Sequence, residues 1–142
     1  MVTMKRLKKM VCGVAVTTAL MVAPVLAATN YNWSGYAYTP GSSILTAAKT
    51  KTTNSSVVAN YSSGSSEWTN VTVQANVGGS WKDCTYYTSS HPVYRAYRGT
   101  GSDKYIDVLN TAYEKYGTVN VRAVFSTLSA GNHSGKWRPD YQ

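Results

Sequence analysis

The chain has 142 residues, and its 14 Lys and Arg against 6 Asp and Glu give a formal net charge of +8. Four of these cations precede residue 10, so residues 28–142 carry ten basic against six acidic side chains, a net charge of about +4. A positive charge this small and scattered argues against nucleic-acid binding. It favours weak, salt-screened attraction to anionic surfaces instead.

The first 27 residues have the organisation of a secretory signal peptide. A lysine-rich start, typical of Gram-positive leaders, precedes the apolar run Met10–Val22 and the segment Ala23–Ala27, which ends in small residues. A membrane anchor is the alternative, but the apolar run is shorter than the roughly 20 residues that a spanning helix needs. We therefore predict cleavage after Ala27 and one secreted domain, residues 28–142, which is extracellular and either free or associated with the cell surface.

The composition of this domain favours a β protein. All 12 Tyr, all 4 Trp and the single Phe follow residue 27, and most of the remainder is Ser, Thr, Asn and Gly. Aromatic and β-branched side chains pack well on a pleated surface. Because only Cys84 follows the leader, no internal disulfide is possible and stability must come from packing.

Alternation of apolar and polar residues with period two predicts two long strands. In Glu67–Val77, valine or alanine at every second position alternates with uncharged polar side chains. Thr118–Leu128 repeats this pattern, and we expect it to cover the first strand from a facing layer. Shorter strands are predicted at Trp33–Thr39, Ser55–Tyr61, Ser80–Thr88 and Val93–Arg98.

Glycine- and serine-rich segments indicate the turns between these strands. Ser62–Ser66 is expected to join its two neighbouring strands in a hairpin. Gly78-Gly79 predicts a second, tighter hairpin, because the favoured two-residue turns need positive φ. Ser42–Thr53 is left open between a helical turn and an extended segment.

The period changes in Asp103–Tyr116, where apolar residues recur at three- and four-residue spacing. This spacing predicts a short crossover helix, with an irregular strand as the alternative. Ser129–Ser134 is expected to be a loop. Gly135–Tyr141 is expected to be a terminal segment and not a central strand, because Pro139 interrupts it. The predicted fold class is all-β, a small antiparallel β-sandwich with one short crossover helix.

The titratable side chains form no catalytic or metal-binding motif in the sequence. His91 and His133 are expected on solvated loops, and they lack metal-ligand spacing. Cys84 is expected on a strand, partly exposed and able to link two copies by a disulfide, with a thiol nucleophile as the alternative. We predict no cofactor, no metal and no catalytic residue. Carboxylates that meet only in the folded chain leave a small hydrolase as the remaining enzyme hypothesis.

The aromatic residues exceed what one small core can hold. Exposed Tyr and Trp rings suit stacking on sugars or contact with a membrane interface. Arginines beside them can bind phosphate or carboxylate groups, although packing within the sheet explains part of the pattern. We predict a ligand-binding surface that comprises Trp81, Tyr86, Tyr94, Arg95, Tyr97, Arg98 and Trp137.

Two segments in the last third of the chain resemble a known class of exported proteins. They are Ser134–Asp140, with the sequence Ser-Gly-Lys-Trp-Arg-Pro-Asp, and Asn110–Gly117 followed by Val119–Arg122. Together with the leader and the composition, they resemble small secreted proteins of Gram-positive bacteria, including the lactococcin-like bacteriocins that target the septum. The resemblance implies a non-enzymatic β-sandwich that acts at a cell envelope, often encoded beside an export or immunity transporter. It transfers no catalytic residue.

We therefore expect a secreted, non-catalytic β-sandwich that acts at or binds the bacterial cell envelope, in the manner of a bacteriocin. The expected partner is a cell-wall or membrane component: an anionic polymer, a peptidoglycan precursor or a lipid. The alternative is a carbohydrate-binding or adhesion module without toxicity, and a small secreted hydrolase ranks third.

Overall fold

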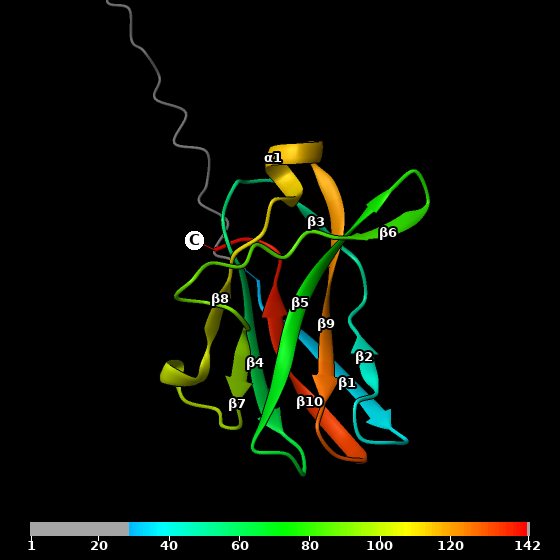
Figure 1. Ribbon diagram of the computed structural model, residues 1–142, viewed down its shortest axis with the longest axis vertical. Coiled ribbons are helices and arrows are strands. Elements are labelled where there is room, and N and C mark those ends of the chain that lie inside the picture. Colours follow the sequence, from blue (N-terminus) through cyan, green and yellow to red (C-terminus); the bar gives the residue numbers. More distant parts are fainter. Residues whose placement is uncertain (1–28, 142) are drawn as a thin grey trace, which may run out of the picture.

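The computed structural model describes residues 29–141, which fold into two packed antiparallel β-sheets (Figure 1). The predicted signal peptide, residues 1–27, lies outside the described residues. No helix within residues 29–141 is long and apolar enough to cross a membrane. The predicted fold class, a small antiparallel β-sandwich with one short crossover helix, is confirmed.

The first layer, sheet A, has four strands in the order β1-β10-β4-β8. The second layer, sheet B, has six, with β9 and β5 at its centre. One edge of β9 pairs with both β2 and β3, and one edge of β5 pairs with both β6 and β7. The strands of sheet A are β1 (Tyr31–Ala37), β4 (Val57–Ser63), β8 (Ile106–Val108) and β10 (Gly131–Arg138). Those of sheet B are β2 (Ser43–Leu45), β3 (Lys49–Lys51), β5 (Trp68–Val77), β6 (Ser80–Asp83), β7 (Arg95–Tyr97) and β9 (Val119–Thr127).

An aromatic stack joins the two sheets in the core. Trp33 of β1 lies on Phe125 of β9, with ring centroids 3.8 Å apart and planes inclined by 19°. The indole N–H of Trp33 donates a 3.0 Å hydrogen bond to the backbone oxygen of Asn60. Gly135 leaves room for this contact, because a Cβ there would overlap both the Trp33 ring and the Asn60 oxygen. Each large apolar side chain buried in this core contributes about 1.5–3 kcal/mol.

The two long strands, β5 and β9, are neighbours in sheet B, so the facing arrangement expected from the sequence is wrong. They pair antiparallel from Thr69 opposite Thr127 to Ala75 opposite Val121. Their alternation correctly identifies the buried face, since Val71 and Val73 are buried. The same alternation arises whether two strands lie side by side or face each other, and the facing layer is sheet A.

The two turn predictions have opposite outcomes. Ser62–Ser66 closes no hairpin, because β4 pairs within sheet A and β5 within sheet B. That segment instead carries the chain from one sheet to the other. The hairpin at Gly78-Gly79 is confirmed: Val77 pairs with Ser80, and the two glycines have φ of 60° and 85°.

Most of the predicted helix at Asp103–Tyr116 is not α-helical. Ser102–Lys104 forms a short 3₁₀ helix, and β8 pairs with β4. The alternative prediction, an irregular strand, is therefore correct for the first half of this segment. Only α1 (Ala112–Tyr116) is helical, and it carries the chain from β8 in sheet A to β9 in sheet B. Strand pairing buries Val108 completely, and this tertiary contact outweighs the local helical spacing.

The C-terminal segment is also different from the prediction. β10 is a central strand that lies between β1 and β4, and it includes residues expected to be a loop. Pro139 follows the last residue of the strand, Arg138, and therefore interrupts none of the pairing. Ser42–Thr53, which the sequence left open, is extended and contains β2 and β3.

Candidate functional site

The outer face of sheet B collects aromatic and arginine side chains from four strands. On β5 the residues at odd positions, such as Val71, are buried, so the even positions from Trp68 onward face outward. Residues paired directly across antiparallel strands share a face. We call the resulting surface the aromatic–arginine face; its members are Trp68 on β5, Arg95 and Tyr97 on β7, Trp81 on β6 and Arg122 on β9.

One end of this face is an aromatic pair with an arginine above it. Trp68 pairs with Tyr97 in register, and their ring centroids lie 5.9 Å apart at an angle of 49°. The guanidinium carbon of Arg95 lies 5.1 Å from the centroid of the Trp68 ring. Tyr97 remains 44% exposed, so its ring is accessible to a partner.

The other end repeats the combination with different residues. The guanidinium carbon of Arg122 lies 4.1 Å from the centroid of the Trp81 ring. To reach that ring, the Arg122 side chain crosses β5, where its Nε donates a 2.9 Å hydrogen bond to Oε1 of Gln74. This hydrogen bond fixes the guanidinium plane over the indole, and the contact with the ring adds about 0.5–1 kcal/mol at an exposed site.

Uncharged polar side chains connect the two ends along β5. Asn70, Thr72 and Gln74 all face outward and are half-buried. The Oδ1 atom of Asn70 is shielded from solvent and accepts no hydrogen bond from the described residues. Trp81 pairs with Asn76, eight residues along β5 from Trp68, so the two ends are roughly 27 Å apart. An extended polymer chain therefore fits this face better than a single small molecule.

Three of the seven residues predicted for the binding surface lie together on this face: Trp81, Arg95 and Tyr97. Sequence reasoning missed Trp68 and Arg122. Their signal was present, because each occupies a polar-row position in one of the two long alternating strands. The alternation alone does not show that the two strands are neighbours, so it does not bring the two residues onto one face.

Two of the predicted surface residues are buried, and their assignment is wrong. Trp137 is 1% exposed, because β10 is central and this position of β10 faces the core. Tyr94 is 3% exposed and its hydroxyl donates a 2.5 Å hydrogen bond to the backbone oxygen of Tyr86. Burial raises the pKa of the Tyr94 phenol. Inward and outward positions alternate along this segment, so Tyr94 points inward and Arg95 outward.

The last two predicted residues lie elsewhere on the surface. Arg98 is exposed and donates a 2.9 Å hydrogen bond from Nη1 to the backbone oxygen of Gly64. Tyr86 is exposed beside a separate cavity near the C-terminus. The aromatic–arginine face includes neither of them.

Cys84 is buried, which contradicts its expected partial exposure. The side chain is 3% exposed within the core, and burial raises the pKa of the thiol. A thiol with a raised pKa is a poor nucleophile, because the thiolate is the reactive form. Burial also removes the basis for a Cys84-linked dimer and for a cysteine hydrolase.

The two histidines have different environments. His91 is exposed, as expected. His133 is 2% exposed, so its predicted position on a solvated loop is wrong. Its Nδ1 lies 2.8 Å from the Tyr61 hydroxyl and its Nε2 lies 2.9 Å from the backbone oxygen of Ser129. The carbonyl can only accept, so in a neutral ring Nε2 is the donor and Nδ1 accepts from the tyrosine.

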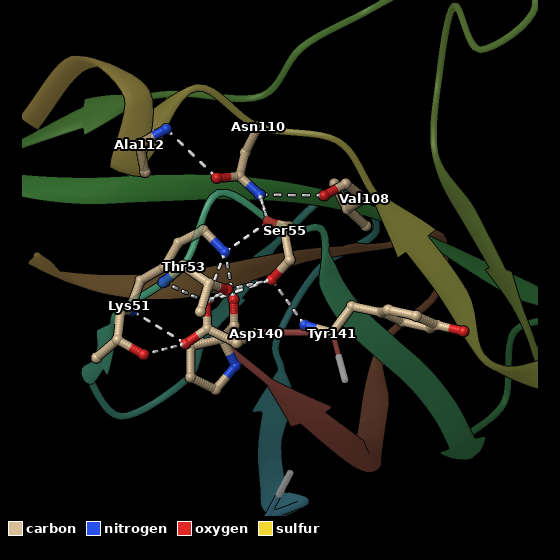
Figure 2. Close-up of polar contacts among 10 residues, drawn as sticks. Lys51, Thr53, Ser55, Val108, Asn110, Ala112, Asp140 and Tyr141 are labelled. Carbon is tan, nitrogen blue, oxygen red and sulfur yellow. Dashed lines mark hydrogen bonds and ion pairs between the residues drawn. The ribbon is translucent and has the colours of Figure 1, made fainter. Parts of the chain in front are cut away.

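A buried ion pair holds the C-terminus against the β3 region (Figure 2). The Lys51 ammonium lies 3.0 Å from Oδ1 of Asp140, and it also donates to the backbone oxygens of Ser55 and Pro139 at 2.5 and 2.7 Å. All three donors of Lys51 are therefore used. Burial lowers the pKa of Lys51, although the hydrogen bond and attraction from Asp140 oppose that shift.

Asp140 accepts further hydrogen bonds from neighbouring residues. The backbone N–H and hydroxyl groups of Thr52 and Thr53 donate to its carboxylate at 2.8–3.2 Å. Burial favours a higher pKa for Asp140, but the hydrogen bonds from Thr52, Lys51 and Thr53 outweigh it and keep the pKa below its usual value. We call this cluster the C-terminal latch; its members are Lys51, Thr52, Thr53, Ser55 and Asp140.

Within the described part of the chain, no group of three or more His, Cys, Asp or Glu side chains is arranged to hold a metal ion. No protein-family model, no curated protein and no solved structure matches this chain.

Proposed function

We propose that this protein is a secreted, non-catalytic binding protein that attaches to an anionic, glycan-containing polymer of the bacterial cell envelope through the aromatic–arginine face. The observation that carries the proposal is the pairing of an arginine with a tryptophan at both ends of one sheet face. Tryptophan rings stack on sugar rings, and arginines bind phosphate or carboxylate groups.

The polar residues between the two ends support an extended ligand. Asn70, Thr72 and Gln74 offer amide and hydroxyl groups without a competing charge. Asn70 Oδ1 accepts no hydrogen bond from the described residues, and a ligand hydroxyl that moves the amide would satisfy it. The net charge of about +4 on residues 28–142 attracts the same class of polymer from a distance.

A bacteriocin-like protein and a carbohydrate-binding or adhesion module would differ in toxicity to neighbouring cells. A bacteriocin-like protein, which the two C-terminal segments resemble, would bind the envelope and then stop the growth of neighbouring cells. A carbohydrate-binding or adhesion module would bind without inhibition. The aromatic–arginine face serves either form, so growth inhibition and binding must be measured separately.

Co-sedimentation with isolated Gram-positive cell walls tests the proposal. The secreted protein should sediment with intact walls and lose most of that binding on walls stripped of phosphate-containing polymers. Trp68→Ala and Trp81→Ala should each weaken binding about fivefold or more, since loss of one stacked ring costs ~1–3 kcal/mol in comparable sites. Growth of neighbouring strains is recorded with the same preparations.

Tyr38→Ala is the matched control, because Tyr38 is an exposed aromatic residue, 83% accessible, that is not part of the aromatic–arginine face. It should leave wall binding unchanged. Equal losses for Tyr38→Ala and Trp81→Ala, or no sedimentation of the unaltered protein with any wall preparation, would refute the proposal.

A further inference from the structure

A cavity beside the C-terminus shares no lining residue with the aromatic–arginine face. Its volume is about 850 Å³, and its walls come from the segment before β4, from β8 and α1, and from the end of the chain. A cavity of this size accommodates a small polar organic molecule. The side chains that define its chemistry are Tyr86, Asp107, Leu109, Glu114 and Tyr141.

Two exposed tyrosines line this cavity. Tyr86 is 53% exposed and Tyr141 is 54% exposed. Other tyrosines of the domain, such as Tyr61 and Tyr94, are buried. The guanidinium carbon of Arg138 lies 5.8 Å from the centroid of the Tyr141 ring. Tyr86 is therefore the ring that offers an apolar surface and a negative π face to an organic cation.

Two carboxylates from different elements line the same space. Asp107 lies on β8 and Glu114 on α1, and both side chains are exposed. Neither belongs to an ion pair within residues 29–141, where the pair Lys51–Asp140 is the single one found. Among the described residues of the lining, Lys115 is the one basic side chain. These described residues therefore carry a net negative charge, which is opposite to the charge of the domain as a whole.

A continuous hydrogen-bond network holds the cavity walls in place (Figure 2). The Asn110 side chain donates to the backbone oxygens of Ser55 and Val108 at 3.4 and 3.2 Å, and its Oδ1 accepts from the backbone N–H of Ala112. The backbone N–H of Tyr141 donates a 3.0 Å hydrogen bond to Ser55 Oγ. Ser55 thus connects the C-terminal latch to the start of α1. Walls fixed in this way reduce the ordering cost of binding.

We propose that this cavity binds its ligand through a primary ammonium group, which lies against the Tyr86 ring and pairs with the carboxylates of Asp107 and Glu114. The ligand class is a small polar amine: an amino sugar or the side-chain amine of a lysine-like residue. Both sources present the same ammonium chemistry. The inference does not depend on polymer binding by the aromatic–arginine face.

Nuclear magnetic resonance titration of the ¹⁵N-labelled protein, purified after expression of the full chain, tests this site. The probes are glucosamine and Nα-acetyl-lysine amide, each compared with its neutral N-acetylated counterpart. We expect at least one ammonium probe to shift the amide resonances of residues 107–115 and Tyr141. The neutral counterpart should bind more weakly by about fivefold or more, and added salt should weaken the ammonium probe alone.

Variants that remove one charge from the cavity test both the direction and the size of the expected change in affinity for the ammonium probe. Asp107→Asn and Glu114→Gln should each weaken the ammonium probe about two- to fivefold, whereas Lys115→Gln should strengthen it by a similar factor. Glu67→Gln is the matched control, because Glu67 is an exposed carboxylate outside the cavity lining. All four side chains are exposed, and the spectrum of each free variant verifies its fold.

The changes in amide resonances with charged and neutral probes decide between support and refutation of the site. Equal binding of charged and neutral probes would overturn the proposal, as would a Glu67→Gln effect equal to that of Glu114→Gln. Absence of shifts with both ammonium probes would overturn it as well. A preference for one of the two probes would support the site and identify which source of the ammonium group fits the cavity.

Discussion

The C-terminal latch and the aromatic–arginine face use positive charge in opposite ways. In the latch, Lys51 is fully buried and directs its three donors at one carboxylate and two backbone oxygens. On the face, Arg95 and Arg122 lie over indole rings and take part in no ion pair within residues 29–141. A charge with a counter-charge inside the protein therefore contributes to the fold, whereas a charge without one is available to a ligand.

The largest change in the free energy of unfolding is expected when Asp140 is removed from the C-terminal latch. Asp140→Ala leaves the Lys51 ammonium buried without its counter-charge, which typically costs about 3–5 kcal/mol. Urea unfolding should show this loss of the free energy of unfolding. Asp103→Ala, which removes an exposed carboxylate, should change that free energy by no more than about 0.5 kcal/mol. An Asp140→Ala protein as stable as Asp103→Ala would show that the latch is not structural.

Acid should weaken the C-terminal latch. Because the pKa of Asp140 is lower in the folded protein than the ordinary value of 3.8, its contribution is fully present above that value. The contribution is lost as the pH falls through the lowered pKa. The free energy of unfolding should therefore decline more steeply below pH 3.8 in the unaltered protein than in Asp140→Asn, as measured by urea titration at a series of pH values. Parallel declines would contradict this assignment.

The smallest stability effect is expected on the face. Trp81→Ala removes a half-buried ring and its contact with Arg122 at the edge of sheet B, so the free energy of unfolding should fall by only about 1 kcal/mol. The same urea measurement, made beside Asp140→Ala, tests the contrast directly. A loss of about 3 kcal/mol or more would place Trp81 among the residues that support the fold.

The sequence predicted what depends on local pattern. Alternation in β5 and β9 identified their buried faces, and Gly78-Gly79 identified a hairpin, because each signal lies within a few neighbouring residues. The pattern could not show that β5 and β9 share a sheet. That pairing joins residues about 50 positions apart and depends on what the other strands cover.

The same limit explains the partial prediction of the candidate site. The three predicted residues Trp81, Arg95 and Tyr97 lie on the aromatic–arginine face. Trp137 is buried instead, because the segment expected at the terminus is the central strand β10. Arg122 was missed because its partner ring, Trp81, lies on the far side of β5. The latch joins residues 51 and 140, and no local signal links them.

The most direct test of the account compares two pairs of cations in one wall-binding measurement. Arg95→Ala combined with Arg122→Ala removes the two arginines that lie over tryptophan rings. Lys82→Ala combined with Lys136→Ala removes the same charge from exposed positions off the face. We predict that the arginine pair lowers affinity for intact cell walls about tenfold or more, and that the lysine pair lowers it only about twofold. Equal losses from both pairs would contradict the central claim, because attraction to the wall would then depend on net charge and not on the aromatic–arginine face.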